Sequence, residues 1–131
     1  MKWNVDTTVE FLHMAKPLWK KYKSLMDDLE NFKKELEENP FQGDMLTPGI
    51  RKIRMAITSK GGGKSKGARI ITLTYSIDET NGNIVLLLIY DHNIADNVNT
   101  NVVKDIVSEL GYNMEAQVQD RTAIFGVRYR P

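Results

Sequence analysis

Seven basic side chains and no acidic one lie in the middle of this 131-residue sequence, between Met45 and Ile77. The formal net charge of the chain is +1, so the residues outside this segment carry −6. Like charges placed together cost stability, and a localised basic segment is the electrostatic footprint of polyanion binding. The alternative interpretation is a solvated lysine-rich loop. The seven residues are Arg51, Lys52, Arg54, Lys60, Lys64, Lys66 and Arg69.

Four glycines interrupt this basic segment in the stretch Ser59–Arg69. Gly63-Lys64-Ser65 resembles the end of a phosphate-binding P-loop. That motif requires a glycine where this sequence has Thr58, and it precedes a helix rather than a strand, so we reject it. Because glycine restricts the backbone so little, the stretch predicts a mobile hairpin loop that presents its cations to a ligand. A plain flexible linker is the alternative.

An alternation of side-chain types from Ile50 to Thr58 predicts a strand with Lys52 and Arg54 on one face. The other face carries the bulky apolar residues Ile53, Met55 and Ile57. Arg69 begins the next predicted strand, Ala68–Ile77, which we expect to run antiparallel to the first. The three cations are therefore expected to lie close together and to surround one phosphate group.

Asp91 and His92 form the one candidate acid/base pair, at the end of the apolar run Ile84–Tyr90. A histidine that simply lies at the surface is the alternative, and His13 is expected to pack or to face solvent. The sequence has no cysteine, which excludes disulfides, cysteine-ligated zinc and thiol catalysis. No carboxylate lies within the basic segment, so we expect no metal site and no cofactor.

Two helices are predicted ahead of the basic segment, after a short strand at Lys2–Val5. Thr7, with a glutamate three residues later, has the spacing of a capping box for the first helix. Pro17 predicts a bend or a break in that helix. Ser24, with an aspartate three residues later, repeats the capping signal for the second helix. The apolar residues of the second helix recur at helical spacing and are Leu25, Leu29, Phe32 and Leu36.

The rest of the pattern is typical of strands and one more helix. A turn-rich stretch, Gln42–Gly49, precedes the first strand of the basic segment, and Asn81-Gly82 predicts a hairpin turn into the central strand Ile84–Tyr90. Asn101–Leu110 predicts a last helix with Gly111 as its C-cap. The element order predicts an α+β fold in which two helices pack on one face of a small, mainly antiparallel sheet.

The length fits one compact domain. Residues 112–131 form a C-terminal extension, and its strand-like part, Ala123–Tyr129, is expected to dock on a sheet edge, with a frayed tail as the alternative. The sequence has no secretion signal and no apolar run long enough for a membrane span. We therefore expect a cytoplasmic protein with no membrane partner.

Several motifs, taken in order, closely resemble RelE/HigB-type toxins of bacterial type II toxin–antitoxin modules, members of the RelE/ParE superfamily. These motifs are Asn39-Pro40-Phe41, Gly49-Ile50-Arg51-Lys52-Ile53-Arg54, Gly63-Lys64-Ser65, Gly67-Ala68-Arg69-Ile70-Ile71 and Leu86-Leu87-Leu88-Ile89-Tyr90-Asp91. The stretch Lys20–Leu25 also matches the helical hairpin of the family. The resemblance covers Met1 to Gly111.

The resemblance implies that residues 1–111 form a RelE-like toxin domain. Its expected fold is an N-terminal helical hairpin packed on a small twisted, mainly antiparallel sheet, with a C-terminal helix. The implied activity is metal-independent endoribonuclease cleavage of translated mRNA in the ribosomal A site. The implied protein partner is a cognate antitoxin with a helix-turn-helix DNA-binding domain.

The basic catalytic positions of the family carry over onto Lys52, Arg54 and Arg69, with Lys64 as a weaker addition. RNA supplies the nucleophile, its 2′-hydroxyl, so the protein has to position the backbone, stabilise charge and move protons. We expect Arg54 and Arg69 to stabilise the phosphate in the transition state and Lys52 to transfer protons.

The sequence departs from the family at its other catalytic positions. Asn93 lies where some members have an arginine, and we add the neighbouring His92 to the catalytic set. Tyr90 and Tyr112 are the candidates for a catalytic tyrosine of some relatives. Side chains expected to contact RNA without catalysing are Arg51, Lys60, Lys64 and Lys66.

Two other functions fit parts of the pattern. A ParE-like toxin of the same superfold binds and inhibits DNA gyrase and cleaves nothing, but it does not require the three clustered cations. A basic RNA-binding module without activity is the third interpretation. Few aromatic residues interleave the cations, so the sequence gives little support for a stacking platform for single strands.

Overall fold

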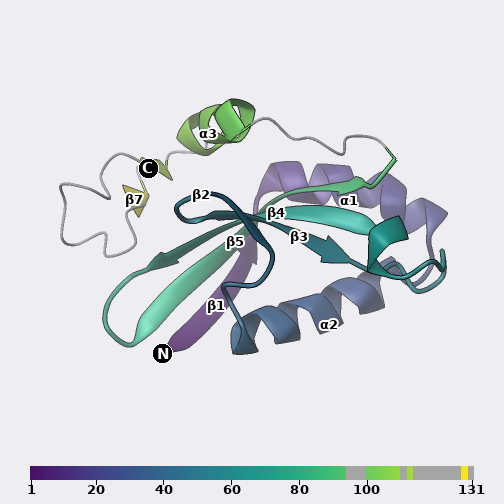
Figure 1. Cartoon of the computed structure of the whole chain (residues 1–131), viewed down its shortest axis with the longest axis horizontal. Coiled ribbons are helices and arrows are strands. Elements are labelled where there is room, and N and C mark those ends of the chain that lie inside the picture. Colours follow the sequence, from purple (N-terminus) through teal and green to yellow (C-terminus); the bar gives the residue numbers. More distant parts are fainter. Residues whose placement is uncertain (94–99, 110–111, 114–127, 130–131) are drawn as a thin grey trace.

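The computed structural model describes residues 1–93, 100–109, 112–113 and 128–129. In this part of the chain, three α-helices and a five-stranded mixed sheet form an α+β fold, with strand order β1-β5-β4-β3-β2 (Figure 1). β1 (Lys2–Thr7) pairs in parallel with β5 (Asn81–Asp91), and the other pairings in this sheet are antiparallel. The other elements of this fold are α1 (Val9–Lys21), α2 (Leu25–Glu38), β2 (Asp44–Thr47), β3 (Ile50–Met55), the 3₁₀ turn η1 (Lys64–Lys66), β4 (Ala68–Ser76) and α3 (Thr100–Glu109).

α1 is one continuous helix, so the predicted break at Pro17 is wrong. Pro17 and His13 are both exposed, and water can therefore solvate the carbonyl group that the proline leaves without an N–H partner. The cap residue is Thr8, whose Oγ1 accepts a hydrogen bond from the Phe11 N–H at 2.9 Å. The predicted cap, Thr7, is still paired with Leu86 in the sheet.

α2 buries the four apolar residues that its spacing predicts, and they pack against the sheet. Ser24 precedes this helix but makes no capping bond. Its hydroxyl group instead donates to Asp28 Oδ2 at 2.7 Å and contacts the Ser59 side chain at 2.9 Å. The capping prediction for Ser24 is therefore wrong, because this residue ties α2 to the glycine-rich loop.

Two apolar clusters lie on opposite faces of the sheet. α1 and α2 cover the first face, where Ile53, Met55 and Ile57 are buried as predicted. The second face carries Ile50 and Leu73 and packs against Val103 and Val107 of α3. α3 begins one residue earlier than predicted, and Leu110 and Gly111 lie outside the described residues. The sheet is thus a central layer between helices.

Two features of the sheet differ from the predictions. The stretch predicted to be only turns contains β2, which pairs with β3 because Gly43 and Gly49, with φ of 87° and 86°, let the chain reverse on either side of it. Asn81-Gly82 is not the hairpin turn but the start of β5. Asp78 makes that turn, since its carboxylate accepts hydrogen bonds from the Thr80 and Asn81 N–H groups. These bonds lower the pKa of Asp78 to about 2.

The predicted first strand is confirmed as β1, so the helical pair follows a strand and does not open the chain as the resemblance implies. Because β1 pairs in parallel with β5, the mainly antiparallel sheet is mixed. Beyond α3, β6 (Tyr112–Asn113) pairs with β7 (Arg128–Tyr129) in a separate two-stranded sheet. The rest of the predicted strand Ala123–Tyr129 lies outside the described residues. Within the described residues, no helix combines the length and apolar character that a membrane span requires.

The parallel pairing of β1 with β5 yields a prediction about Gly82. It lies opposite Trp3, and a Cβ atom there would overlap the indole ring. We expect Gly82→Ala to lower the free energy of unfolding by about 2 kcal/mol in urea denaturation, a typical cost of overfilling a packed contact. In a Trp3→Ala background the same substitution should cost much less. An equal cost in both backgrounds would show that the ring is not the cause.

Candidate functional site

The glycine-rich loop has a defined path at the end of the sheet. Gly61, Gly62 and Gly63 have φ of 80°, 85° and 68°, a region that side chains with a Cβ rarely adopt, and the η1 turn follows. Gly67 passes so close to the Met55 carbonyl oxygen that a Cβ would overlap it. The glycines therefore allow the loop to fold back over the end of β3, and its mobility stays a prediction.

The guanidinium group of Arg69 binds the backbone of the η1 turn. Its side chain is buried, its Nη1 donates to the Lys64 carbonyl at 3.1 Å, and its Nη2 donates to the Ser65 carbonyl at 3.0 Å. Nη1 also lies 3.4 Å from the Ala68 carbonyl. Among the described residues, the partners of this guanidinium are carbonyl oxygens and no carboxylate, so a buried positive charge lies at the surface end of β4 without a counterion.

The sheet register places Arg54 directly opposite Arg69. Arg54 is exposed, and two residues earlier on the same face lies Lys52, which is half-buried. The predicted shared face of these three cations is therefore confirmed by the register. Lys52 also lies opposite Asp44 of β2. The sequence did not predict this neighbour, because it did not predict β2.

The other four basic residues divide between this region and elsewhere. Lys64 and Lys66 are exposed on η1, close to the carbonyl groups that Arg69 binds. Arg51 alternates onto the opposite face, where its guanidinium lies 5.7 Å from the centre of the Phe41 ring. Lys60 turns toward the end of β5. The basic segment thus supplies one group of five cations, formed by Lys52, Arg54, Lys64, Lys66 and Arg69, which we call the cationic end.

A second cluster joins Lys60 to Asp91 and His92. Lys60 Nζ lies 2.9 Å from Asp91 Oδ1 and 3.1 Å from Oδ2, and His92 Nδ1 lies 3.0 Å from Oδ1. The Tyr22 hydroxyl group donates to Asp91 Oδ2 at 3.3 Å. Three positions far apart in the sequence therefore meet on one buried carboxylate, which we call the Asp91 cluster.

Both contacts of His92 engage the same ring nitrogen. Nδ1 lies beside Asp91 Oδ1 and beside the Lys60 ammonium group, the latter at 3.3 Å. A proton on Nδ1 can be donated to the carboxylate, and a lone pair on Nδ1 can accept from the ammonium group, so either arrangement leaves Nε2 to exchange protons with a ligand. Burial raises the pKa of Asp91, but the hydrogen bond from Lys60, the Asn93 N–H and the Lys60 charge outweigh it. The pKa therefore lies below its ordinary value.

The cationic end and the Asp91 cluster lie at the same end of the sheet. Asp91 is paired with Ala68, one residue from Arg69, and the His92 N–H donates to the Gly67 carbonyl at 3.1 Å. The Asp91 side chain reaches Tyr22 on the helical side, whereas Arg54 and Arg69 lie on the other face. Figure 1 shows the η1 turn at the end of the sheet away from α3.

Sequence reasoning found some members of this site and missed others. Tyr22 and the anchoring role of Asp91 were missed, because nothing local links Tyr22 or Lys60 to the end of β5. Of the two candidate tyrosines, Tyr90 is buried directly opposite Arg69, and Tyr112 belongs to β6. Across the described ranges, no three His, Asp or Glu side chains come close enough to hold a metal ion.

Comparison of the chain with models of known protein families finds no model that matches it.

The ion pair at Asp91 predicts a pH-dependent stability. Asp91→Asn removes the carboxylate that Lys60 and His92 share, and we expect the free energy of unfolding at pH 7 to fall by about 1–3 kcal/mol. The folded-state pKa of Asp91 lies below the unfolded value of 3.8. Its stabilising contribution is therefore present above about pH 4 and is lost as the pH falls through the folded pKa.

Chemical denaturation from pH 7 to pH 3 measures this contribution, and the difference between the parent and Asp91→Asn should shrink as the pH falls. Glu79→Gln, which neutralises an exposed carboxylate in the β4–β5 turn, is the control and should show a small difference throughout. A difference for Asp91→Asn that is as large at pH 3 as at pH 7 would contradict the assignment.

Proposed function

We propose that this protein is a metal-independent endoribonuclease that acts as the toxin of a type II toxin–antitoxin module. Its substrate is translated mRNA, and its reaction is attack of the RNA 2′-hydroxyl on the adjacent phosphate. The observation that carries the proposal is the pairing of exposed Arg54 with buried Arg69 at the cationic end. Two adjacent cations of this kind form a site for one phosphate group.

The electrostatics of this pair favour an anion on its surface. The Arg69 charge is shielded from water, and carbonyl oxygens satisfy its N–H groups without neutralising it. A phosphodiester beside Arg54 would supply the missing negative charge. As the 2′-oxygen attacks, negative charge grows on the phosphate oxygens, and fixed cations stabilise that charge without reorganising.

Proton transfer falls to His92 in this proposal. The 2′-hydroxyl proton has to leave as the oxygen bonds to phosphorus, and the 5′-oxygen has to gain a proton as its bond to phosphorus breaks. Asp91 orients the imidazole so that Nε2 is available for one of these transfers. We prefer His92 to Lys52 for this role because Lys52 has Asp44 beside it, and we assign Lys52 to phosphate binding.

The loop cations extend the binding surface. Lys64 and Lys66 are exposed on η1, and lysines at such positions contribute to RNA binding by neutralising phosphates without selecting a sequence. In this proposal an RNA strand crosses the η1 end of the sheet, contacts the cationic end on one face and reaches His92 where it passes round the ends of the strands. The products are then a 2′,3′-cyclic phosphate on one fragment and a 5′-hydroxyl group on the other.

Ribosome-bound mRNA and an antitoxin partner enter the proposal through the resemblance to RelE/HigB-type toxins. The layered arrangement of two helices on one face of the strands β3, β4 and β5 supports this part of the proposal. So does the position of the cations on these strands and on the loop between them.

Substitution of Arg54 tests the cationic end. We expect Arg54→Ala to lower the rate of mRNA cleavage on ribosomes by about 100-fold or more and to relieve growth arrest, because a donor to the developing charge is lost. The melting temperature should hardly change, since the side chain is exposed. Lys34→Ala, which removes an exposed cation on α2, is the matched control and should cleave at the parental rate. Arrest that persists through gyrase inhibition, without cleavage, would favour a ParE-like toxin instead.

The chemical groups at the ends of the cleaved RNA test the 2′-hydroxyl mechanism. Cleaved RNA should carry a 2′,3′-cyclic phosphate or the 3′-phosphate formed from it. The protein should also remain active when EDTA is added under conditions in which the ribosomes stay intact. His92→Gln should slow cleavage, because the side chain that transfers a proton is lost. A 3′-hydroxyl end on the upstream fragment would refute the 2′-hydroxyl mechanism.

A further inference from the structure

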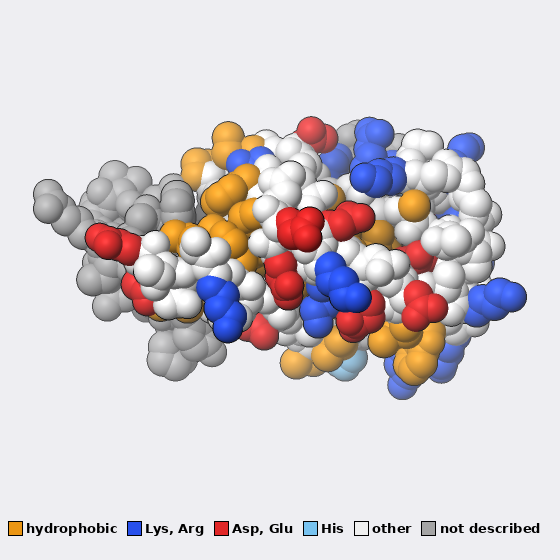
Figure 2. Space-filling model, turned by 90° about the horizontal axis from the view of Figure 1, so that it is seen from below, with side chains coloured by type: hydrophobic (Ala, Val, Ile, Leu, Met, Phe, Trp, Pro, Cys, Tyr) orange, Lys and Arg blue, Asp and Glu red, His pale blue; other side chains and the backbone are white. Residues whose placement is uncertain are grey.

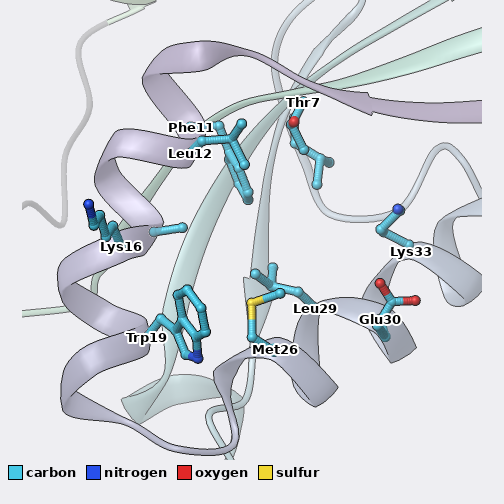
Figure 3. A pocket seen from close by; sticks show the side chains of 11 residues that line it. Thr7, Phe11, Leu12, Lys16, Trp19, Met26, Leu29, Glu30 and Lys33 are labelled. Atoms are coloured by element: carbon cyan, nitrogen blue, oxygen red, sulfur yellow. The ribbon is translucent and has the colours of Figure 1, made fainter.

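An open groove of about 410 Å³ lies between α1 and α2, on the opposite face of the sheet from the Arg54–Arg69 pair (Figure 3). Its lining is mainly apolar, and its floor includes Phe11 and Leu86. Trp19 of α1 and Met26 of α2 face each other across it. The two helices therefore both pack on the sheet and leave a groove between them.

The groove is bordered by large apolar side chains that remain in water. Leu12 is 55% exposed, Trp19 52% and Met26 46%. On α1 the exposed Val9 continues this row, three residues before Leu12 and therefore on the same helical face. Clustered exposed apolar side chains of this size mark an interaction surface, and single scattered ones do not.

The two helices carry opposite charges beside this apolar row. With histidine neutral, α1 has a formal charge of +2 and α2 has −4. Lys16 and Lys20 lie one turn apart on the exposed side of α1, and Glu30 and Glu37 lie two turns apart on the exposed side of α2. Figure 2 shows acidic side chains predominating along the middle of this face, with apolar and basic side chains along the lower edge of the view.

We propose that this face is where two copies of the chain associate about a two-fold axis. In a two-fold interface the same surface meets itself in the opposite direction, so α1 of each copy can lie against α2 of the other. The lysine side of one helix then meets the acidic side of its partner twice. The apolar residues Leu12, Trp19 and Met26 come together in the middle of the interface, where they leave water.

The size of the surface sets the strength of this association. Helices of 13 and 14 residues are each about 20 Å long, so the face they span together is roughly half of the 800 Å² that each partner contributes to a typical stable interface. The dimer is therefore weak and depends on concentration, with a Kd on the order of micromolar or higher.

Charge reversal tests both the surface and the two-fold geometry. One variant carries Lys16→Glu and Lys20→Glu, and the other carries Glu30→Lys and Glu37→Lys. Sedimentation velocity of the full chain, from about 1 to about 500 μM to bracket this Kd, should show that each variant alone dimerises at least ten-fold more weakly than the parent. Mixing the two variants should restore association, because both α1–α2 contacts are then attractive.

The mixing step separates lost association from lost folding, since an unfolded variant would not recover on mixing. Trp19→Ser should weaken dimerisation of the parent by a similar factor, and Lys2→Ala on β1 should leave it unchanged. A parent that stays monomeric at every concentration would overturn the proposal. So would a dimer that neither charge variant weakens, or variants that do not recover together. The cleavage assay is independent of these outcomes, because none of these residues belongs to the cationic end or the Asp91 cluster.

Discussion

The ion pair between Lys60 and Asp91 joins the glycine-rich loop, the end of α1 and the end of β5. Lys60 comes from the glycine-rich loop and Asp91 ends β5, and the Tyr22 hydroxyl group connects the end of α1 to the same carboxylate. Because the carboxylate is buried, removing either charged partner would leave the other without this opposite charge in a poorly solvated place. The pair thus fixes the loop, the helix and the strand relative to one another, and it also orients the imidazole of His92.

The residues of the basic segment have different partners in the fold and therefore different roles. Lys60 neutralises a carboxylate, Arg69 binds the carbonyl groups of η1, and Arg51 lies against an aromatic ring. The charge that a ligand can reach is therefore smaller than a count of the sequence suggests. This charge is also concentrated in one place. Arg54 is exposed, and directly opposite it on β4 lies Arg69, whose buried positive charge acts on a ligand at the same position. A net charge describes long-range attraction, but the contacts within the fold determine which of the cations stay accessible to a ligand.

Local patterns predicted the elements whose signals are strong over several residues, such as the buried stripe of α2 and the two faces of β3. Predictions based on single residues were wrong where the environment decided the outcome. Pro17 is tolerated within α1 because it lies on the solvent-exposed side of the helix. Asn81 begins a strand because the carboxylate of Asp78 forms the turn before it. The shared face of Lys52, Arg54 and Arg69 followed from alternation and strand pairing. Tyr22 could not be found in this way, because its contact with Asp91 spans 69 residues.

The parallel pairing of β1 with β5 also has a consequence for how the chain folds during synthesis. Residues paired in these strands are 79 positions apart, from Lys2 with Asn81 to Thr7 with Leu86. Contacts of such long sequence separation form slowly, and a chain emerging from the ribosome offers β1 no partner until β5 has been made. The first strand to emerge must therefore wait for the last strand of its sheet. Since Asp91 ends β5, completion of the sheet and assembly of the Asp91 cluster belong to the same late step.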